Sequence, residues 1–160
     1  MNIKRDFMPS HVLEISRLSK LYGKTIGIDD ISFTLEEGEI FGFIGPNGAG
    51  KSTTIRILLN LIFPTGGSAK IMGMDVIKDS KKIKMVTGYI PSDANAYPFM
   101  TVNEFLNYCM RFYGQKNGSE RRNELAEIFD LDLKKKISDL SFGNRRKVSI
   151  VQSLQHNPSF

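Results

Sequence analysis

The hydrophobic and polar positions of this chain follow a strand-like period at its start. Residues 11–18 and 31–35 alternate apolar and polar side chains on either side of a turn at residues 22–24, which predicts antiparallel β-structure. Residues 40–44 are apolar at every position that is not glycine. Such a run is typical of a central parallel strand that is buried on both faces.

A helical period begins after residue 50. Apolar residues recur there at i, i+3, i+4 and i+7, which predicts a helix with one apolar face. The pattern then predicts a short strand at 69–71, a helix near residues 80–85 and a strand at 87–90. Strands that alternate with helices indicate an α/β fold. The apolar face of the first helix consists of Ile55, Leu58, Leu59 and Ile62.

From residue 101 the pattern becomes helical. Thr101 and Glu104 have the spacing of a capping box, which predicts the start of an amphipathic helix that continues to about residue 113. A second helix is predicted at 119–129 and a last one at about 144–156. Residues 101–140 are therefore expected to form a small helical insert. The apolar face of the last helix consists of Val148, Val151 and Leu154.

Composition and charge set the broad class of protein. The chain has 160 residues, of which 41% are hydrophobic, enough for one buried core. The formal charge of +5 suits anionic partners but does not separate a triphosphate from nucleic acid or a membrane surface. The single cysteine, Cys109, excludes an internal disulfide, and its register with a helical apolar face indicates a core residue. No apolar run is long enough to span a bilayer and residues 1–10 lack the apolar segment of a secretory signal, so we expect a soluble, cytosolic chain.

Residues 45–52 match every fixed position of the phosphate-binding pattern G-x-x-x-x-G-K-[ST]. The segment lies between the predicted strand at 40–44 and the helix that begins at Lys51, which is the context that the pattern requires. Its glycines let backbone N–H groups approach the β- and γ-phosphates, Lys51 adds a positive charge, and Ser52 offers a hydroxyl to Mg²⁺. We therefore predict that the chain binds a nucleoside triphosphate. The predicted site consists of Gly45, Pro46, Asn47, Gly48, Ala49, Gly50, Lys51, Ser52 and Thr53.

A second motif narrows the class of P-loop protein. Residues 140–144 read Leu-Ser-Phe-Gly-Asn, lie just before a basic helix and follow the helical insert. In this order and context they resemble the LSGGQ signature of ABC-type ATPases. Residues 87–92 resemble the approach to the Q-loop of that family, and residues 97–102 resemble the entry to its helical subdomain. The candidate signature residues are Leu140, Ser141, Phe142, Gly143 and Asn144.

The resemblance implies a P-loop NTPase fold with an ABC-type ATPase core, in which an antiparallel β part at the N-terminus precedes a helical subdomain. The expected parts are residues 1–91, 92–140 and 141–160. Tyr22 resembles the aromatic residue that stacks on adenine in the family, although a turn aromatic that packs on the sheet has the same sequence pattern. For the signature, the alternative is a solvated basic helix end after an ordinary turn.

Two kinds of departure from the family pattern matter. Ser92 stands where the family has the Q-loop glutamine, and its side chain is too short to reach Mg²⁺ without a bridging water. Phe142 replaces a signature glycine and Asn144 a glutamine. The sequence also stops where the family begins the strand that carries its Mg²⁺-binding aspartate and catalytic glutamate. The resemblance therefore implies an N-terminal fragment whose catalytic residues are unknown, and we expect these 160 residues alone to be inactive in hydrolysis.

The resemblance further implies the ATP-binding subunit of an ABC transporter for drugs, antibiotics or peptides. Its expected cofactors are ATP and Mg²⁺. Its expected partners are a transmembrane permease, through which this cytoplasmic chain would be held at the inner face of the cell membrane, and a second ATPase protomer paired head-to-tail. Ser141 and Gly143 would then contact the ATP of the second protomer. The apolar cluster at residues 94–100 would contact a permease helix, or else pack beneath the helical insert.

Two other functions stay open on the sequence. One is a nucleotide-binding module without turnover that acts by binding ATP or a partner. The other is a soluble ABC ATPase that acts on ribosomes or DNA, although the paired ATPase domains or long inserts usual in such proteins are not visible here. No nucleic acid partner is expected on the leading interpretation.

Overall fold

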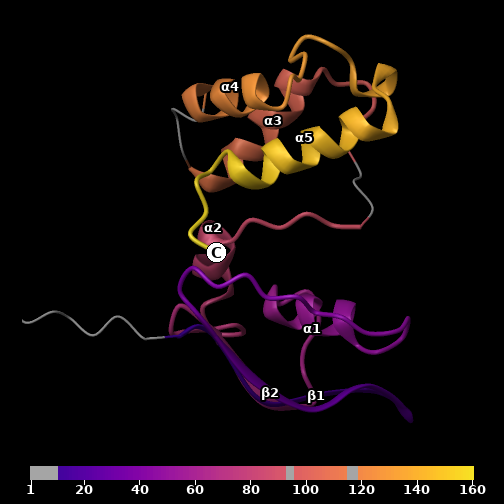
Figure 1. The fold of residues 1–160 in the computed structure, drawn as a ribbon, viewed down its shortest axis with the longest axis vertical. Coiled ribbons are helices and arrows are strands. Elements are labelled where there is room, and N and C mark those ends of the chain that lie inside the picture. Colours follow the sequence, from indigo (N-terminus) through magenta and orange to yellow (C-terminus); the bar gives the residue numbers. More distant parts are fainter. Residues whose placement is uncertain (1–10, 93–95, 115–118) are drawn as a thin grey trace, which may run out of the picture. The chain divides into compact units, whose positions relative to one another are not determined.

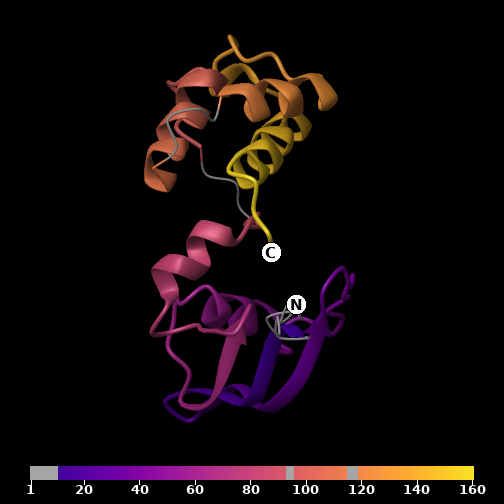
Figure 2. The same cartoon turned by 90° about the vertical axis from the view of Figure 1, so that its left-hand side faces the viewer.

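The computed structural model describes residues 11–92, 96–114 and 119–160, and the chain divides into two compact units at the boundary between Lys84 and Met85. The first unit is built on a four-stranded antiparallel sheet with the strand order β2-β1-β3-β4 (Figures 1 and 2). The strands are β1 (His11–Tyr22), β2 (Thr25–Glu36), β3 (Gly66–Ile71) and β4 (Met74–Asp75). The predicted antiparallel pair and the strand at 69–71 are confirmed. The buried apolar residues of the sheet are Leu13, Ile15, Leu18, Ile28, Ala69 and Ile71.

Helix α1 (Lys51–Leu58) packs on this sheet and confirms the helix predicted after the loop. Its predicted apolar face is wrong in part, since Ile55 is 39% exposed and Ile62 lies beyond the helix end. Thr54 and Ile57 are buried instead. The predicted period covers a longer helix, whereas α1 has eight residues and only about two turns. The side of α1 that meets β2 and β3 decides which residues are buried.

The strands predicted at 40–44, as a buried parallel strand, and at 87–90 are also wrong. Residues 40–44 form no regular strand, and Ile40 and Ile44 are 99% and 95% exposed. Residues 87–90 are likewise irregular; there, Gly88 N–H donates to the Phe160 carbonyl at 2.8 Å. A parallel strand needs a neighbouring strand for its N–H and C=O groups, and in the described residues every pairing of named strands is antiparallel within the β2-β1-β3-β4 sheet.

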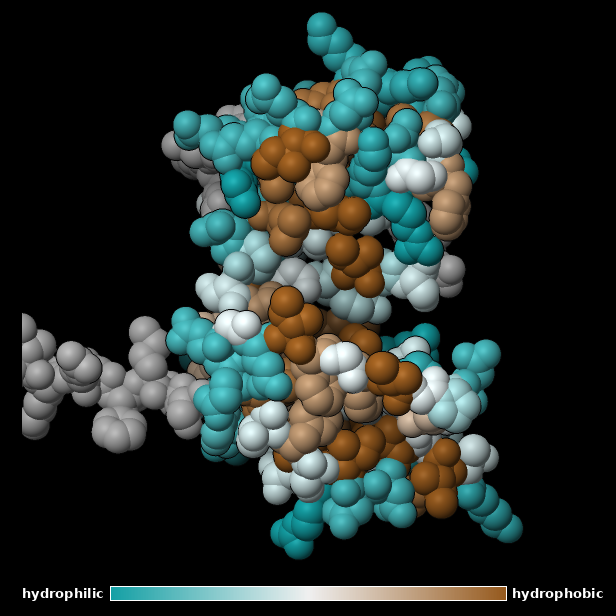
Figure 3. Space-filling view, in the orientation of Figure 1, coloured by the Kyte–Doolittle hydropathy of each residue, from teal (hydrophilic) through white to brown (hydrophobic). Residues whose placement is uncertain are grey.

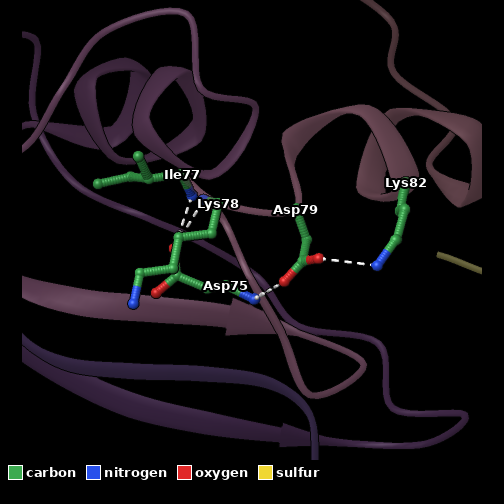
Figure 4. A network of polar contacts seen from close by, with 5 residues as sticks. All are labelled: Asp75, Ile77, Lys78, Asp79 and Lys82. Carbon is green, nitrogen blue, oxygen red and sulfur yellow. Dashed lines mark hydrogen bonds and ion pairs between the residues drawn. The ribbon is translucent and has the colours of Figure 1, made fainter.

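The chain leaves the sheet through a carboxylate-stabilised turn before helix α2 (Ser80–Val86), which confirms the helix predicted near 80–85. One carboxylate oxygen of Asp75 accepts hydrogen bonds from the backbone N–H groups of Ile77 and Lys78 at 2.9 and 3.0 Å (Figure 4). Asp79 accepts from the Asp75 N–H at 3.3 Å and pairs with the Lys82 ammonium at 3.0 Å. These contacts satisfy backbone groups where the strand ends.

The second unit is helical, as predicted (Figure 1). Its elements are α3 (Val102–Met110), η1 (Arg111–Tyr113), α4 (Ser119–Ile128), η2 (Ile137–Asp139) and α5 (Phe142–Leu154). Ten buried residues of these elements and their connections form one core. They are Val102, Phe105, Leu106, Leu125, Ala126, Leu131, Ile137, Leu140, Val148 and Val151.

Two local predictions in this unit are confirmed. Thr101 N–H donates to the Glu104 carboxylate at 2.8 Å, and Glu104 N–H donates to the Thr101 hydroxyl at 3.2 Å, which completes the capping box. Cys109 packs against the helical core, and burial raises the pKa of its thiol to about 11. In the part of the chain that the structure describes, no helix has the length and hydrophobicity needed to cross a membrane.

Candidate nucleotide-binding site

The phosphate-binding loop is an exposed turn that ends against the sheet. Residues 45–49 are exposed, whereas Gly50 is buried. Inside the loop, Ala49 N–H donates to the Pro46 carbonyl at 3.2 Å. The first helical bond runs from Thr54 N–H to the Gly50 carbonyl at 2.9 Å, so the N–H groups of residues 50–53 lie at the free end of α1. A helix N-terminus of this kind presents N–H groups to an anion.

Gly50 fixes the loop to strand β2. Its φ angle is +86°, and a Cβ atom at this position would lie 2.2 Å from Ile28 Cγ2 and 2.6 Å from the Gly27 carbonyl oxygen. Both the backbone conformation and the close approach therefore require glycine. Gly48 has the same φ of +86°, but a Cβ there would meet nothing within 4 Å. The backbone conformation requires glycine at both positions, and the close approach to β2 is a further requirement at Gly50 alone.

Lys51 reaches back over the loop that precedes it. Its Nζ donates hydrogen bonds to the carbonyl oxygens of Gly45 and Pro46 at 2.6 and 2.7 Å. The ammonium group is thereby held over the exposed turn, on the side where the loop begins. A positive charge in this place, next to the free N–H groups of α1, suits the phosphates of a nucleotide.

Ser52, whose hydroxyl is predicted to bind Mg²⁺, is exposed in the first turn of α1. Across the described residues, no group of three or more His, Cys, Asp or Glu side chains is arranged to hold a metal ion. Thr54 is a residue that the motif did not reveal. It is 2% exposed, and its hydroxyl donates to the Gly50 carbonyl at 3.1 Å, which ties the start of α1 to the end of the loop.

Tyr22 lies at the end of β1 and is 47% exposed. Its ring lies so close to the sheet that a Cβ on Gly27 would be 2.8 Å from Tyr22 Cε2, and the Lys20 ammonium is 5.2 Å from the ring centroid. The ring thus packs on the sheet and still has exposed surface, so stacking on adenine stays a prediction.

The signature residues begin helix α5, two residues earlier than predicted. Ser141 is the N-cap, and its hydroxyl accepts a hydrogen bond from Asn144 N–H at 3.2 Å. Leu140 is buried in the helical core, whereas Gly143 is exposed, and a Cβ atom added there would meet nothing within 4 Å outside its own helix backbone. Because the helix begins at Phe142, the basic run at 145–147 follows the first turn instead of occupying it.

Phe142 is 68% exposed, and the Arg146 guanidinium carbon lies 5.1 Å from its ring centroid. Arg146 also donates to the Pro91 carbonyl at 3.2 Å. The signature helix is therefore hydrogen-bonded to Pro91. Ser92, the next residue, is exposed. The sequence contains no local signal for this bond, since 55 positions separate the two residues. Ser92 and the signature lie in the helical unit, whereas the phosphate-binding loop lies in the sheet unit.

A protein-family model described as "ABC transporter" matches residues 28–160. The chain belongs to the ABC transporter family. Its structure is the P-loop fold of an ABC ATPase core, with the antiparallel sheet at the N-terminus.

Several curated relatives cover nearly all of the chain. The probable multidrug ABC transporter ATP-binding protein YbhF of Escherichia coli K12 is 33% identical over 92% of this chain and 26% of its own length. The linearmycin resistance ATP-binding protein LnrL of Bacillus subtilis strain 168 is 35% identical over 92% of this chain and 49% of its own. The bacitracin transport ATP-binding protein BcrA of Bacillus licheniformis is 35% identical over 93% of this chain and 49% of its own length. The chain thus spans about a quarter to a half of the length of these relatives.

Solved structures agree with this assignment. An ATP-binding subunit of an ABC transporter superposes with a TM-score of 0.84 at 30% identity, over 92% of this chain and 63% of the other. The dimeric bacterial ABC transporter cassette MJ0796 superposes with a TM-score of 0.79 at 26% identity, over 91% of this chain and 70% of the cassette. The family and the fold are therefore established for this chain.

Proposed function

We propose that this chain is the nucleotide-binding part of an ABC transporter subunit, which binds Mg-ATP at residues 45–53 and acts on a separate membrane permease. The observation that carries the proposal is the position of Lys51, held 2.6 and 2.7 Å from two loop carbonyls beside the free N–H groups of α1. These groups fit a triphosphate, because an ammonium and backbone N–H groups are the donors that phosphate oxygens accept from. Mg²⁺ would be held by Ser52 and by the phosphates themselves.

A second ATPase protomer is the proposed partner of the signature. Support comes from the exposure of Gly143 and Phe142 at the N-terminal end of α5, and from the dimeric state of the similar cassette MJ0796. A phosphate at this end would interact favourably with the helix dipole and with the basic side chains that follow the first turn. In this arrangement Ser141 and Gly143 contact the nucleotide of the partner protomer. Ser92 lies at the Q-loop position of the nucleotide site in its own protomer.

The permease is proposed to dock on the outward face of α3. A hollow of about 500 Å³ lies there, and Phe99 and Tyr97 beside it are 71% and 45% exposed. The Tyr97 and Phe99 rings are tilted by 45° to each other, and Tyr97 continues through Tyr108 to Phe112 in edge-to-face contacts. Ala94 and Asn95 of the predicted cluster lie outside the described residues. Figure 3 shows hydrophobic surface on the helical unit as on the sheet unit. An apolar helix of the permease suits such a hollow. The residues that line it are Phe99, Met100, Glu104, Asn107, Tyr108 and Arg111.

The names of the relatives suggest what the transporter carries. YbhF is named for multidrug transport, LnrL for linearmycin resistance and BcrA for bacitracin transport. We therefore propose a drug or peptide antibiotic as the class of substrate, with the chain at the cytoplasmic face of the membrane through the permease. ATP hydrolysis is proposed for the whole subunit, and no residue of this chain is assigned to activate water.

A titration with fluorescent ATP tests the nucleotide site. Binding that requires Mg²⁺ and is competed by ATP supports the proposal, whereas binding that survives both EDTA and excess ATP contradicts it. Co-purification with a permease from detergent-solubilised membranes tests the transporter role separately, so a failure of one leaves the other interpretable.

A further inference from the structure

The end of helix α5 carries a buried histidine. His156 is 3% exposed, and its Nε2 lies 3.2 Å from the carbonyl oxygen of Thr87. Its ring is stacked on the ring of Tyr113, with centroids 3.9 Å apart and planes 18° apart. The imidazole therefore contacts η1 on one side and the irregular segment after α2 on the other, and none of the family motifs described above involves it.

The partner of Nε2 requires a proton on that nitrogen. A carbonyl oxygen only accepts hydrogen bonds, so Nε2 must carry the proton. In a neutral imidazole Nδ1 is then an acceptor, and among the described residues no group donates to it. A second proton would have to enter at this buried nitrogen, where the structure offers no acceptor for the new N–H.

Among the described residues, no acidic side chain acts on the His156 ring. Residues 148–154 of α5, Gln155 and residues 157–160 have no titratable side chain. From η1 the phenol of Tyr113 faces the ring, with the Cys109 thiol of α3 next to it, and burial raises the pKa of each. Both are neutral near pH 7, so neither supplies a charge. Burial lowers the pKa of His156, although its bond to the Thr87 carbonyl acts in the opposite direction.

His156 stands where several parts of the helical unit meet. The adjacent Gln155 donates from Nε2 to the Leu106 carbonyl of α3 at 3.1 Å. After His156 the backbone turns at Asn157, whose φ is +54°, and Ser159 N–H then donates to the Val86 carbonyl at 2.8 Å. Loss of the imidazole contacts would leave this crossing of residues 157–160 over residues 86–88 held by its backbone hydrogen bonds and by the packing of Pro158 beside Gly88.

We propose that the neutral imidazole of His156 is a pH-sensitive latch, which fastens residues 156–160 and the η1 turn to residues 86–88 and releases them when it is protonated. The direction follows from linkage. A histidine whose pKa is lower in the folded state binds fewer protons there, so the latch is fully closed above the ordinary histidine value of about 6.5. The stabilisation by the neutral imidazole decreases as the pH falls below that value, and it is fully lost below the folded-state pKa of His156.

Hydrogen exchange of the full 160-residue chain tests the latch. Exchange in peptides that cover residues 86–88 and 156–160 is measured at about pH 8 and about pH 5.5 and normalised to the intrinsic rate at each pH. The parent is expected to exchange several-fold faster at the lower pH. His156→Phe keeps an aromatic ring against Tyr113 but cannot titrate, so its normalised rates should not change. His11→Phe removes the other histidine of the chain and should keep the response of the parent.

The tautomer gives a second readout. In His11→Phe the remaining imidazole signals belong to His156, and ¹⁵N spectra at about pH 8 should show Nε2 protonated and Nδ1 bare. Protonation at Nδ1 instead, an equal response to pH in parent and His156→Phe, or no protection of these peptides in the parent at the higher pH would each overturn the proposal.

Discussion

The Nζ of Lys51 lies 2.6 Å from the carbonyl oxygen of Gly45, so the seventh residue of the phosphate-binding loop is hydrogen-bonded to the first. The lysine thus has two tasks. It closes the loop on its own carbonyls, and it places a positive charge where phosphates are expected to bind. A substitution should affect the nucleotide far more than the fold, because these two hydrogen bonds belong to an exposed turn.

Lys51→Ala should weaken Mg-ATP binding about 10- to 100-fold, since hydrogen bonds to a charged group contribute about 1.5–3 kcal/mol and 1.4 kcal/mol is tenfold in affinity. Titration with fluorescent ATP measures the change, and circular dichroism checks that the helix content is kept. Lys81→Ala, at an exposed position on α2, is the matched control. Equal affinity of Lys51→Ala and the parent would contradict the assignment of the site.

Gly50→Ala should destabilise the sheet unit more than Gly48→Ala. Both glycines have a φ of +86°, which costs an alanine about 1–2 kcal/mol. At position 50 the new methyl group would also collide with the Gly27 carbonyl and Ile28, whereas at position 48 it would meet open space. Urea unfolding of the two variants compares the costs. Similar midpoints for both would show that the loop does not pack on β2 as described.

Asp75→Asn should lower the melting temperature near neutral pH and have less effect in acid. The N–H groups of Lys78 and Ile77 lower the pKa of Asp75, so its carboxylate stabilises the fold above the unfolded pKa of about 4. That contribution is lost as the pH falls through the lower, folded-state pKa. Because protonated Asp75 resembles asparagine, the melting temperatures of parent and variant should converge at a pH below that pKa. Asp29→Asn, which changes an exposed carboxylate on β2, is the control. A difference from the parent that is independent of pH would be contrary to expectation.

Phe99→Ser should weaken the binding of a permease about tenfold and leave ATP binding unchanged, as is usual for an exposed aromatic anchor of an interface. Ile128→Ser is a suitable control, since Ile128 is 69% exposed and Phe99 71%, and both lie in the helical unit. Co-purification from solubilised membranes measures the loss. If both variants bind the permease equally well, the hollow beside α3 is not the docking site.

Replacement of both Ile40 and Ile44 by lysine should reduce self-association of the purified 160-residue chain. These side chains are 99% and 95% exposed, and exposed apolar groups of this kind promote association. Exposed substitutions usually change the free energy of unfolding by less than about 0.5 kcal/mol, so stability should be kept. Light scattering gives the association state. A large loss of stability would mean that the segment is buried in solution.

The local features of the candidate site could be predicted from the sequence because each depends on neighbours along the chain. The pattern of residues 45–52 required a loop followed by a helix, and α1 begins at Lys51. Thr101 and Glu104 form their capping box because the two side chains are three residues apart on one helical turn. The antiparallel β1 and β2 pair follows from alternation around a short turn.

Tertiary structure decided what depends on partners far away in the chain. Residues 40–44 have the composition of a buried strand, but composition supplies no neighbouring strand, and in the described structure Ile40 is exposed. The buried side of α1 was fixed by its contact with β2 and β3, which placed Thr54 rather than Ile55 inside. The bond from Arg146 to the Pro91 carbonyl, and the burial of His156 between Thr87 and Tyr113, likewise join segments that no sequence period connects. A sequence pattern specifies which face of an element is apolar, whereas the packing of the chain determines what that face meets.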